Sequence, residues 1–170
     1  MIFVTVGTNE APFDRMLEAL DNVEVDDKLV IQCGASTVRP AGAECVEFLS
    51  FDELVDLVRA ARLVVTHAGV GSIAVALANG KRPIVVPRRV AFGEAVDDHQ
   101  LAFARRFAAS GQVKLVEDLT DLPAAITQHD SDAEDLGPRD SNASALAAEI
   151  HAYVAAAVAS EPRRFVVDRL

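Results

Sequence analysis

The segment best suited to chemistry is Thr66-His67-Ala68-Gly69-Val70-Gly71-Ser72. An apolar run precedes it, and a helical pattern begins near Ser72. Two glycines allow a tight turn there and leave no Cβ between the backbone and a ligand. A helix N-terminus offers free N–H groups and a positive dipole end, to which Ser72 would add a hydroxyl. The segment therefore predicts a phosphate or diphosphate site, although turns of this kind also favour Gly and Ser for structural reasons alone.

A second polar segment, residues 87–100, follows another apolar run and is rich in charge. Because the carboxyl ends of parallel strands meet at one edge of a sheet, we expect this segment near the glycine turn. Its side chains suit an anion and polyhydroxyl site. They are Arg88, Arg89, Glu94, Asp97, Asp98, His99 and Gln100. Two other interpretations stay open. The arginines could pair with Asp97 or Glu94 in a solvated loop, or they could contact a uronate carboxylate or a lipid diphosphate.

The run Gly69–Ala74 also fits G-x-G-x-x-A, the dinucleotide fingerprint. Two features speak against that interpretation. The fingerprint normally follows the first strand of its unit, and the acidic ribose partner expected about 20 residues further on is missing from Pro83–Arg89. The Arg88-Arg89 pair could accommodate a 2′-phosphate, so an NADP-binding module remains an alternative.

The elements that must position these residues are short apolar runs alternating with helical patterns. The predicted strands are Ile2–Val6, Leu29–Cys33, Cys45–Phe48, Leu63–Thr66, Ile84–Val86 and Val113–Leu115. The predicted helices are Pro12–Leu20, Phe51–Ala60, Ser72–Ala78 and Asp98–Ala109, with a capping box at Ser50–Glu53 and stops at Asn79-Gly80 and Ser110-Gly111. Strands that are apolar throughout are typical of parallel sheets covered on both faces. The pattern predicts an α/β fold with a single Rossmann-like, doubly wound parallel sheet over residues 1–127.

The alternation stops after residue 127. Residues 128–142 are acidic, contain Gly137-Pro138 and are predicted to form a loop. Residues 143–159 predict a helix that packs on its own domain or docks a partner, and residues 160–170 form a tail. The D-x-D run Asp130-Ser131-Asp132 lies in the loop, away from the strand edges, so we expect no metal site there.

Composition restricts the partners and the compartment. The 170 residues suit one domain, and 26 acidic against 16 basic residues give a net charge of −10. Such a field repels phosphate backbones, so we expect no nucleic-acid partner. Cys33 and Cys45 are too few for a disulfide framework, and no signal peptide or membrane span is evident. We therefore expect a cytoplasmic protein with free thiols.

Taken in order, four segments resemble glycosyltransferase family 28. They are Val4–Thr8, His67–Ser72, Gly80–Pro83 and Pro87–Arg89 with Asp98–Gln100, and the match covers roughly residues 1–126. The resemblance is to the nucleotide-sugar-binding C-terminal half of these two-domain GT-B enzymes. It is closest to stand-alone small subunits of two-part transferases, such as those of bacterial exopolysaccharide glucuronosyl transfer and of dolichol-linked N-acetylglucosaminyl transfer.

The resemblance implies a UDP-sugar donor and a set of site residues. By family pattern, His67, Gly69, Val70, Gly71 and Ser72 hold the diphosphate, with His67 and Ser72 stabilising the leaving group. Asp98 and Gln100 read donor-sugar hydroxyls, the backbone of Leu49-Ser50 meets the uracil, and Gly7-Thr8 line the same crevice. Relatives often place a ribose-binding Glu where this chain has Val75. Ribose recognition must then differ or come from Glu94.

The resemblance also implies a partner. This chain is long enough for the donor half alone, so the acceptor half and any membrane attachment should come from another subunit; in isolation a homodimer is an alternative. We expect inverting transfer without a metal or other cofactor. The general base is unknown; Glu10 is a candidate, and the partner chain is a better one. A noncatalytic nucleotide-sugar-binding or regulatory subunit remains the main alternative function.

Overall fold

The computed structural model describes residues 1–129 of the chain. Within them, six parallel strands form one sheet in the order β3-β2-β1-β4-β5-β6. Their bounds are β1 Ile2–Thr5, β2 Leu29–Gln32, β3 Glu44–Val46, β4 Leu63–His67, β5 Ile84–Val86 and β6 Lys114–Leu115. The order reverses between β1 and β4. The predicted doubly wound parallel sheet is confirmed, and the reversal marks the switch point at which open α/β sheets bind ligands.

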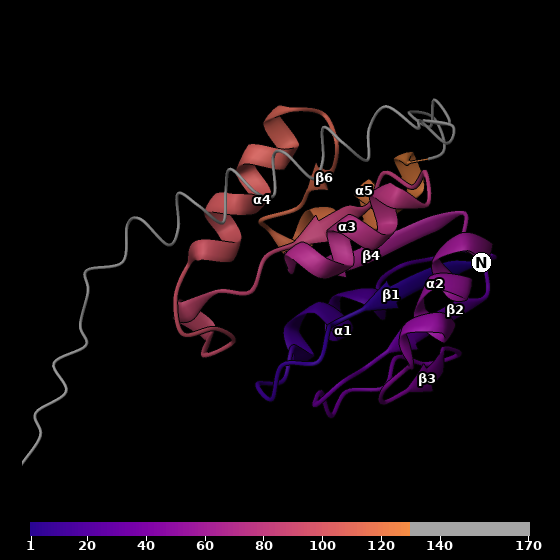
Figure 1. Ribbon diagram of the computed structural model, residues 1–170. Coiled ribbons are helices and arrows are strands. Elements are labelled where there is room, and N and C mark those ends of the chain that lie inside the picture. Colours follow the sequence, from indigo (N-terminus) through magenta and orange to yellow (C-terminus); the bar gives the residue numbers. More distant parts are fainter. Residues whose placement is uncertain (130–170) are drawn as a thin grey trace, which may run out of the picture. The chain divides into compact units, whose positions relative to one another are not determined.

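Helices cover both faces of this sheet (Figure 1). They are α1 Asp14–Leu20, α2 Phe51–Ala60, α3 Val70–Ala78, α4 His99–Ala109 and α5 Leu122–Gln128, with short 3-10 turns η1 Val90–Phe92 and η2 Leu119–Asp121. Helix α1 contacts α5, and helix α2 contacts α3. Each face of the sheet therefore carries its own pair of packed helices.

The core consists of two apolar layers, one on each face of the sheet. On one face, Ile2 and Val4 of β1 belong to a buried cluster with Leu17 of α1 and Ile126 of α5. On the other face, Phe3 clusters with residues of α2 and α3. Successive residues of β1 thus enter opposite layers, which explains why the strand is apolar throughout.

Local sequence signals account for several element ends. Helix α2 has the predicted bounds, and its capping box is formed: Ser50 Oγ accepts the Glu53 N–H at 3.3 Å, while Glu53 Oε2 accepts the Ser50 N–H at 2.8 Å. The predicted stops at Gly80 and Gly111 adopt φ values of +73° and +75°. This left-handed backbone is where helices end and where glycine is favoured.

Other boundaries differ from the predictions. Helix α3 begins at Val70, two residues earlier than predicted, and α1 begins at Asp14. Helix α5 was not predicted, and it takes Gln128 from the loop expected at 128–142. Residues 130–142 of that loop, the helix expected at 143–159 and the tail expected at 160–170 lie outside the described residues. No helix within residues 1–129 is both long and apolar enough to cross a membrane.

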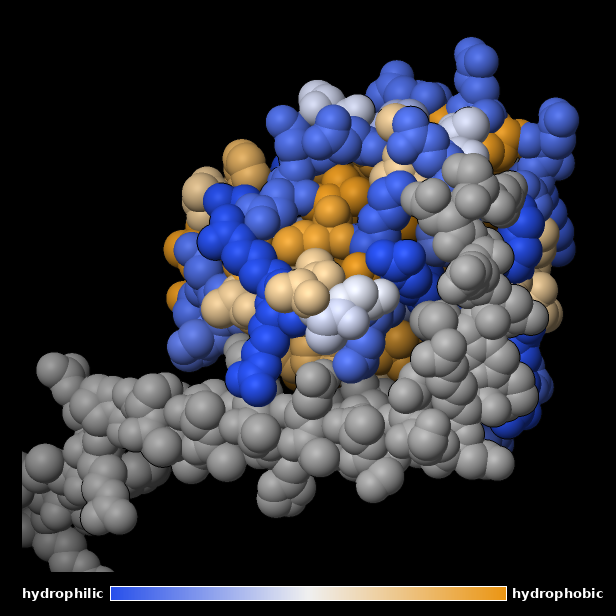
Figure 2. All heavy atoms as spheres, turned by 90° about the horizontal axis from the view of Figure 1, so that it is seen from above, coloured by the Kyte–Doolittle hydropathy of each residue, from blue (hydrophilic) through white to orange (hydrophobic). Residues whose placement is uncertain are grey.

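Seen from above Figure 1, one face of the molecule has hydrophobic residues in its middle and hydrophilic residues around them (Figure 2). All large hydrophobic side chains that are exposed in the described chain follow β3 or β5: Phe48, Phe51, Val90, Phe92 and Val96. Because parallel strands end at one edge, these residues all lie in segments that follow the carboxyl edge of the sheet.

Candidate functional site

A cavity of about 250 Å³ opens at the carboxyl edge of the sheet, at the switch point between β1 and β4. Its walls come from the ends of β1, β2 and β4, from the loop before α2 and the first turn of α2, and from the start of α3. The lining residues are Thr5, Gly7, Thr8, Gln32, Leu49, Leu54, His67, Gly69, Gly71 and Ser72. Seven of the sequence-predicted site residues therefore lie around one cavity: Gly7, Thr8, Leu49, His67, Gly69, Gly71 and Ser72.

Helix α3 presents an uncapped N-terminus to this cavity. Gly69 is its N-cap, in extended conformation, and has no side chain that could accept from the first turn. The first intrahelical bond runs from the Ile73 N–H to the Gly69 carbonyl at 3.1 Å. The N–H groups of Val70, Gly71 and Ser72 consequently have no acceptor within the helix. Ser72 is the third helical residue rather than the first, and its hydroxyl lies on the same turn as these donors.

The ring of His67 packs between two glycines. A Cβ placed on Gly69 would lie 2.2 Å from His67 Nε2, and one on Gly7 would lie 2.5 Å from His67 Cε1. Both distances are far below van der Waals contact, so these glycines make room for the imidazole. Gly71 differs, because a Cβ there would meet nothing within 4 Å. It leaves open space at the cavity wall instead.

His67 is neutral at physiological pH. Burial and, to a smaller extent, the nearby Arg88 guanidinium together lower its pKa from 6.5 to about 4. A neutral imidazole has one donor and one acceptor nitrogen. His67 can therefore hydrogen-bond a ligand at the cavity, while the positive field there comes from the α3 terminus.

Two polar residues of the cavity wall, Thr5 and Gln32, were missed by the sequence analysis. The buried Gln32 Oε1 accepts from Thr5 Oγ1 at 2.5 Å and from the Gly7 N–H at 3.2 Å. Its Nε2 donates to the carbonyls of Gly7 and Glu47, each at 2.9 Å. Gln32 thus ties the loop after β1 to the loop after β3. A glutamine ending the apolar run Leu29–Ile31 was the signal available in the sequence.

The wall formed by the loop before α2 and by the first turn of α2 is apolar. Leu49 and Leu54 line the cavity, whereas both the N–H and the hydroxyl of Ser50 are engaged by Glu53 in the capping box. Val75, at the position where relatives place a Glu, is partly buried against the core layer that contains Leu49 and Leu54. It faces that layer and presents no polar group.

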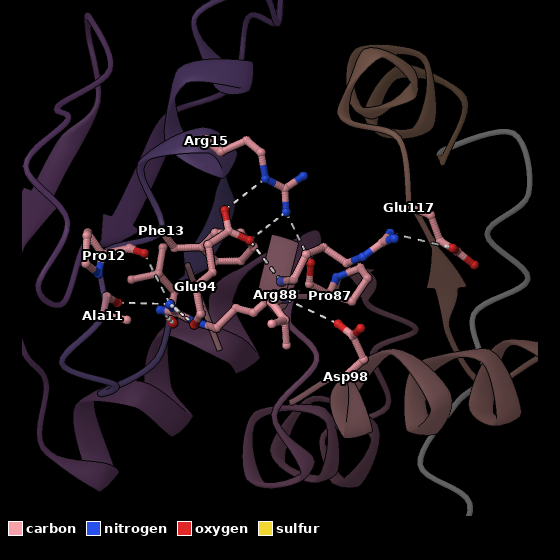
Figure 3. Close-up of polar contacts among 12 residues, drawn as sticks. Ala11, Pro12, Phe13, Arg15, Pro87, Arg88, Glu94, Asp98 and Glu117 are labelled. Carbon is pink, nitrogen blue, oxygen red and sulfur yellow. Dashed lines mark hydrogen bonds and ion pairs between the residues drawn. The ribbon is translucent and has the colours of Figure 1, made fainter. Parts of the chain in front are cut away.

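Arg88 has a structural position rather than the ligand contact considered from the sequence. It is 1% exposed, and its guanidinium stacks on Phe13 at 4.7 Å (Figure 3). It donates to four carbonyl oxygens at 2.9–3.3 Å, those of Val6, Ala11, Pro12 and Glu94. Three of these belong to the loop between β1 and α1. Arg88 therefore fixes this loop through hydrogen bonds to its backbone. The neighbouring Arg89 forms an ion pair with Glu117, at 4.0 Å.

Glu94 is likewise occupied. Only 4% of this residue is exposed, and its carboxylate forms a bidentate pair with Arg15 at 2.8 and 2.9 Å. One of its oxygens also accepts the Arg89 N–H at 3.0 Å. Three of the roughly four acceptor positions of this carboxylate are therefore used within the protein, which leaves little capacity for the ribose contact suggested by the sequence.

The remaining candidates lie outside the cavity wall. Asp98 precedes α4, and its Oδ1 accepts the Val90 N–H at 3.3 Å. Gln100 lies in the first turn of α4, and its Oε1 is buried without a hydrogen-bond partner among residues 1–129. Glu10 is exposed, and Val70 starts α3 without lining the cavity. No group of three or more His, Cys, Asp or Glu side chains in the described range is placed to hold a metal ion.

Comparison with known proteins decides the family. Residues 1–155 match the glycosyltransferase family 28 C-terminal domain. The chain belongs to glycosyltransferase family 28. It is also 35% identical over 133 residues to the UDP-N-acetylglucosamine transferase subunit ALG13 of Eremothecium gossypii. That similarity covers 75% of this chain and 62% of the relative, so the family 28 chain matches a part of that protein.

Solved structures agree on the fold of this family 28 domain. The calicheamicin glycosyltransferase CalG4 superposes with a TM-score of 0.62 at 15% identity, over 92% of this chain and 43% of that one. The glycotransferase of kitacinnamycin gives 0.57 at 23% identity, over 89% and 39%. At these identities the likeness concerns architecture. The six-stranded domain matches the C-terminal half of GT-B glycosyltransferases.

Proposed function

We propose that this family 28 domain binds a UDP-sugar and is the catalytic subunit of an inverting glycosyltransferase. One observation carries the proposal. The uncapped N-terminus of α3 faces a cavity at the switch point of the sheet, beside His67 and Ser72. Unpaired N–H groups at a positive helix end suit a diphosphate. The cavity's apolar side, at Leu49 and Leu54, suits the uracil ring, and Thr8 is a wall hydroxyl available to the ribose in place of the family's Glu.

The reaction follows from this placement. An acceptor hydroxyl attacks the anomeric carbon from the face opposite the UDP, the glycosidic bond to the diphosphate breaks, and configuration inverts. Negative charge that develops on the leaving diphosphate meets the N–H groups of Gly71 and Ser72 and the Ser72 hydroxyl. His67 contributes a neutral hydrogen bond. No metal or other cofactor is required for this step, because the helix end supplies the stabilisation.

Asp98 and Gln100 are proposed to read the donor-sugar hydroxyls. Both stand at the start of α4, after β5 and at the same edge as the cavity. The buried Oε1 of Gln100, which has no hydrogen-bond partner within residues 1–129, is an acceptor that a sugar hydroxyl would satisfy. The sugar is a hexose, a uronate or an N-acetylhexosamine, and the acceptor is a lipid-linked or polysaccharide hydroxyl.

A partner subunit is part of the proposal. The domain matches 39–43% of the GT-B structures and 62% of the ALG13 relative, which is itself a transferase subunit. We propose that a membrane-associated subunit supplies the acceptor half and the general base that removes the acceptor proton. Glu10 is the alternative base within this chain. A cytoplasmic location, recruitment to the membrane by the partner and a homodimer in isolation are further expectations.

Thermal unfolding of the purified chain with UDP, UDP-glucose, UDP-glucuronate, UDP-N-acetylglucosamine and NADP tests the proposal. A ligand at a hundred times its Kd adds about 2.7 kcal/mol to the free energy of unfolding. We expect UDP compounds to raise Tm and NADP to leave it unchanged, since Arg88, needed for a 2′-phosphate, is buried in internal contacts. A shift with NADP alone would overturn the donor assignment.

Turnover separates the catalytic subunit from its main alternative. If the chain is a noncatalytic nucleotide-sugar-binding subunit, UDP compounds raise Tm but Ser72→Ala leaves sugar transfer by the assembled complex unchanged. If the chain is catalytic, the same variant slows transfer by the complex. The wild-type complex assayed in parallel gives the reference rate.

A further inference from the structure

The side chain of Arg15 connects helix α1 to the segment that follows β5. Its Nε donates to Glu94 Oε1 at 2.9 Å, and its Nη2 donates to Glu94 Oε2 at 2.8 Å and to the Pro87 carbonyl at 3.3 Å (Figure 3). A bidentate arginine–carboxylate pair fixes direction as well as distance. Arg15 therefore binds this segment at two places, at its start through Pro87 and in its middle through Glu94.

An aromatic contact adds to this grip. The guanidinium carbon of Arg15 lies 4.5 Å from the centre of the Phe92 ring. Phe92 is 60% exposed, so its ring is fixed by this cation–π contact more than by burial. Arg15 thus holds the η1 turn from two sides, through Glu94 and through Phe92.

Hydrogen bonds carry this constraint on to Asp98. Glu94 accepts the Arg89 N–H through its side chain at 3.0 Å and donates its own N–H to the Arg89 carbonyl at 3.2 Å. Val90, which follows Arg89 in the chain, donates its N–H to Asp98 Oδ1 at 3.3 Å. The path from Arg15 through Glu94, Arg89 and Val90 to Asp98 is therefore continuous. Asp98 stands at the N-cap position of α4, and its backbone carbonyl accepts the N–H groups of Leu101 and Ala102 in the turn that carries Gln100.

We infer that Arg15 is a positioning residue that, through Glu94, holds the segment carrying Asp98 and Gln100 in place to read the donor sugar. The inference rests on the proposed function. Arg15 lies outside the cavity wall, so its loss should spare the UDP contacts made by α3. The loss of Arg15 should therefore weaken binding of the sugar part of the donor and leave binding of the UDP part unchanged.

The test compares Arg15→Gln with Arg62→Gln, a matched control. Arg62 pairs with Asp27 at the opposite, amino edge of the sheet, and the two arginine side chains are similarly exposed, at 23% and 32%. Hydrogen exchange of the ligand-free chain comes first. We expect faster exchange of the amides of residues 89–98 in Arg15→Gln and unchanged exchange there in Arg62→Gln. Unchanged exchange in Arg15→Gln would overturn the inference.

Calorimetric titration with UDP and with the preferred UDP-sugar completes the test. In Arg15→Gln the Kd for UDP should stay within about twofold, while the Kd for the UDP-sugar should rise about tenfold, as expected for the loss of about one sugar hydrogen bond. Arg15→Lys, which keeps the charge without the fork, should fall between. Equal weakening of both ligands would overturn the positioning role. If the wild-type chain binds neither ligand, the proposed function fails, while the exchange data still decide whether Arg15 orders the segment.

Discussion

The Nε2 atom of His67 lies 2.2 Å from the point that a Cβ on residue 69 would occupy. Gly69 adopts φ −75° and ψ 130°, a backbone conformation open to every residue type. Glycine at this position is therefore explained by the imidazole beside it and not by the turn. The same contact places the ring beside the N-terminus of α3, next to the N–H groups of its first turn.

Replacing Gly69 with Ala should displace the His67 ring. We expect Gly69→Ala to lower the free energy of unfolding by about 1–3 kcal/mol, the cost of overpacking a filled site. Urea denaturation measures this loss. Gly71→Ala is the control, because its methyl group meets no atom within 4 Å. It should leave stability unchanged or slightly raised and should weaken UDP binding, since Gly71 lines the cavity.

The buried imidazole predicts a loss of stability in acid. The pKa of His67 is about 4 in the folded chain and 6.5 when unperturbed. Between these values the unfolded chain binds a proton that the folded chain excludes. The contribution of His67 is fully present above pH 6.5 and is lost as the pH falls from 6.5 to 4, by up to about 3 kcal/mol.

Urea denaturation at pH 7 and pH 4.5 checks this pH dependence. His67→Gln, which cannot gain a proton, should have a smaller difference in unfolding free energy between the two pH values than the wild-type chain. His99→Gln is the control for the substitution itself, because it makes the same change at an exposed histidine outside the cavity wall. An undiminished difference in His67→Gln would show that other groups cause the acid loss.

Much of the fold was predictable because its signals are local or periodic. Apolar runs located the six strands within a few residues, and the bounds of α2 follow from the capping box at Ser50 and Glu53. Helix α5 was missed because it is short and contains weak helix formers, Pro123, Ile126 and Thr127, whereas the equally short α1 is rich in strong ones. The start of α3 was misplaced, since Val70-Gly71 has no helix-forming signal of its own and the fold decides where that turn begins.

The part of the cavity wall that comes from one continuous segment could be located from the sequence. The glycine turn, His67 and Ser72 are contiguous, and the sheet edge brings Gly7 and Thr8 to them. The roles of Arg88 and Glu94 were not predictable, because their partners Val6 and Arg15 are 82 and 79 residues away in the sequence. Charged residues at the carboxyl edge of the sheet indicated a ligand contact. In the structure, the Nη atoms of Arg88 and the carboxylate of Glu94 form their hydrogen bonds within the protein, and only Arg88 Nε is buried without a partner among the two groups within residues 1–129.

The hydroxyl of Ser72 is expected to contribute to ligand binding and not to the stability of the fold. Ser72 is partly exposed, lines the cavity and is the third residue of α3. Ser72→Ala should leave Tm unchanged and raise the Kd for UDP about tenfold, the loss of roughly one hydrogen bond to a charged group. Calorimetric titration with UDP measures the change. Ser110→Ala, at the C-cap of α4, is the control and should bind UDP with the wild-type Kd.

The neighbours Arg88 and Arg89 should respond in opposite ways to the same substitution. Arg88→Met removes the donor to four carbonyl oxygens, including those of Val6 and Glu94, and leaves these groups unpaired. We expect the free energy of unfolding to fall by about 2–4 kcal/mol. Arg89 makes a partly exposed ion pair with Glu117, so Arg89→Met should cost less than about 1 kcal/mol.

Urea denaturation of these two arginine variants decides between a structural and a ligand-binding Arg88. Because Arg88 secures the loop from Val6 to Pro12, its loss should also speed hydrogen exchange at Gly7 and Thr8, whereas the loss of Arg89 should not. A stable Arg88→Met chain that had lost affinity for a charged donor would instead return Arg88 to the ligand site. We expect instead that Arg88→Met is less stable than the wild-type chain. Its UDP binding should weaken only as a consequence, because Gly7 and Thr8 are no longer held in place.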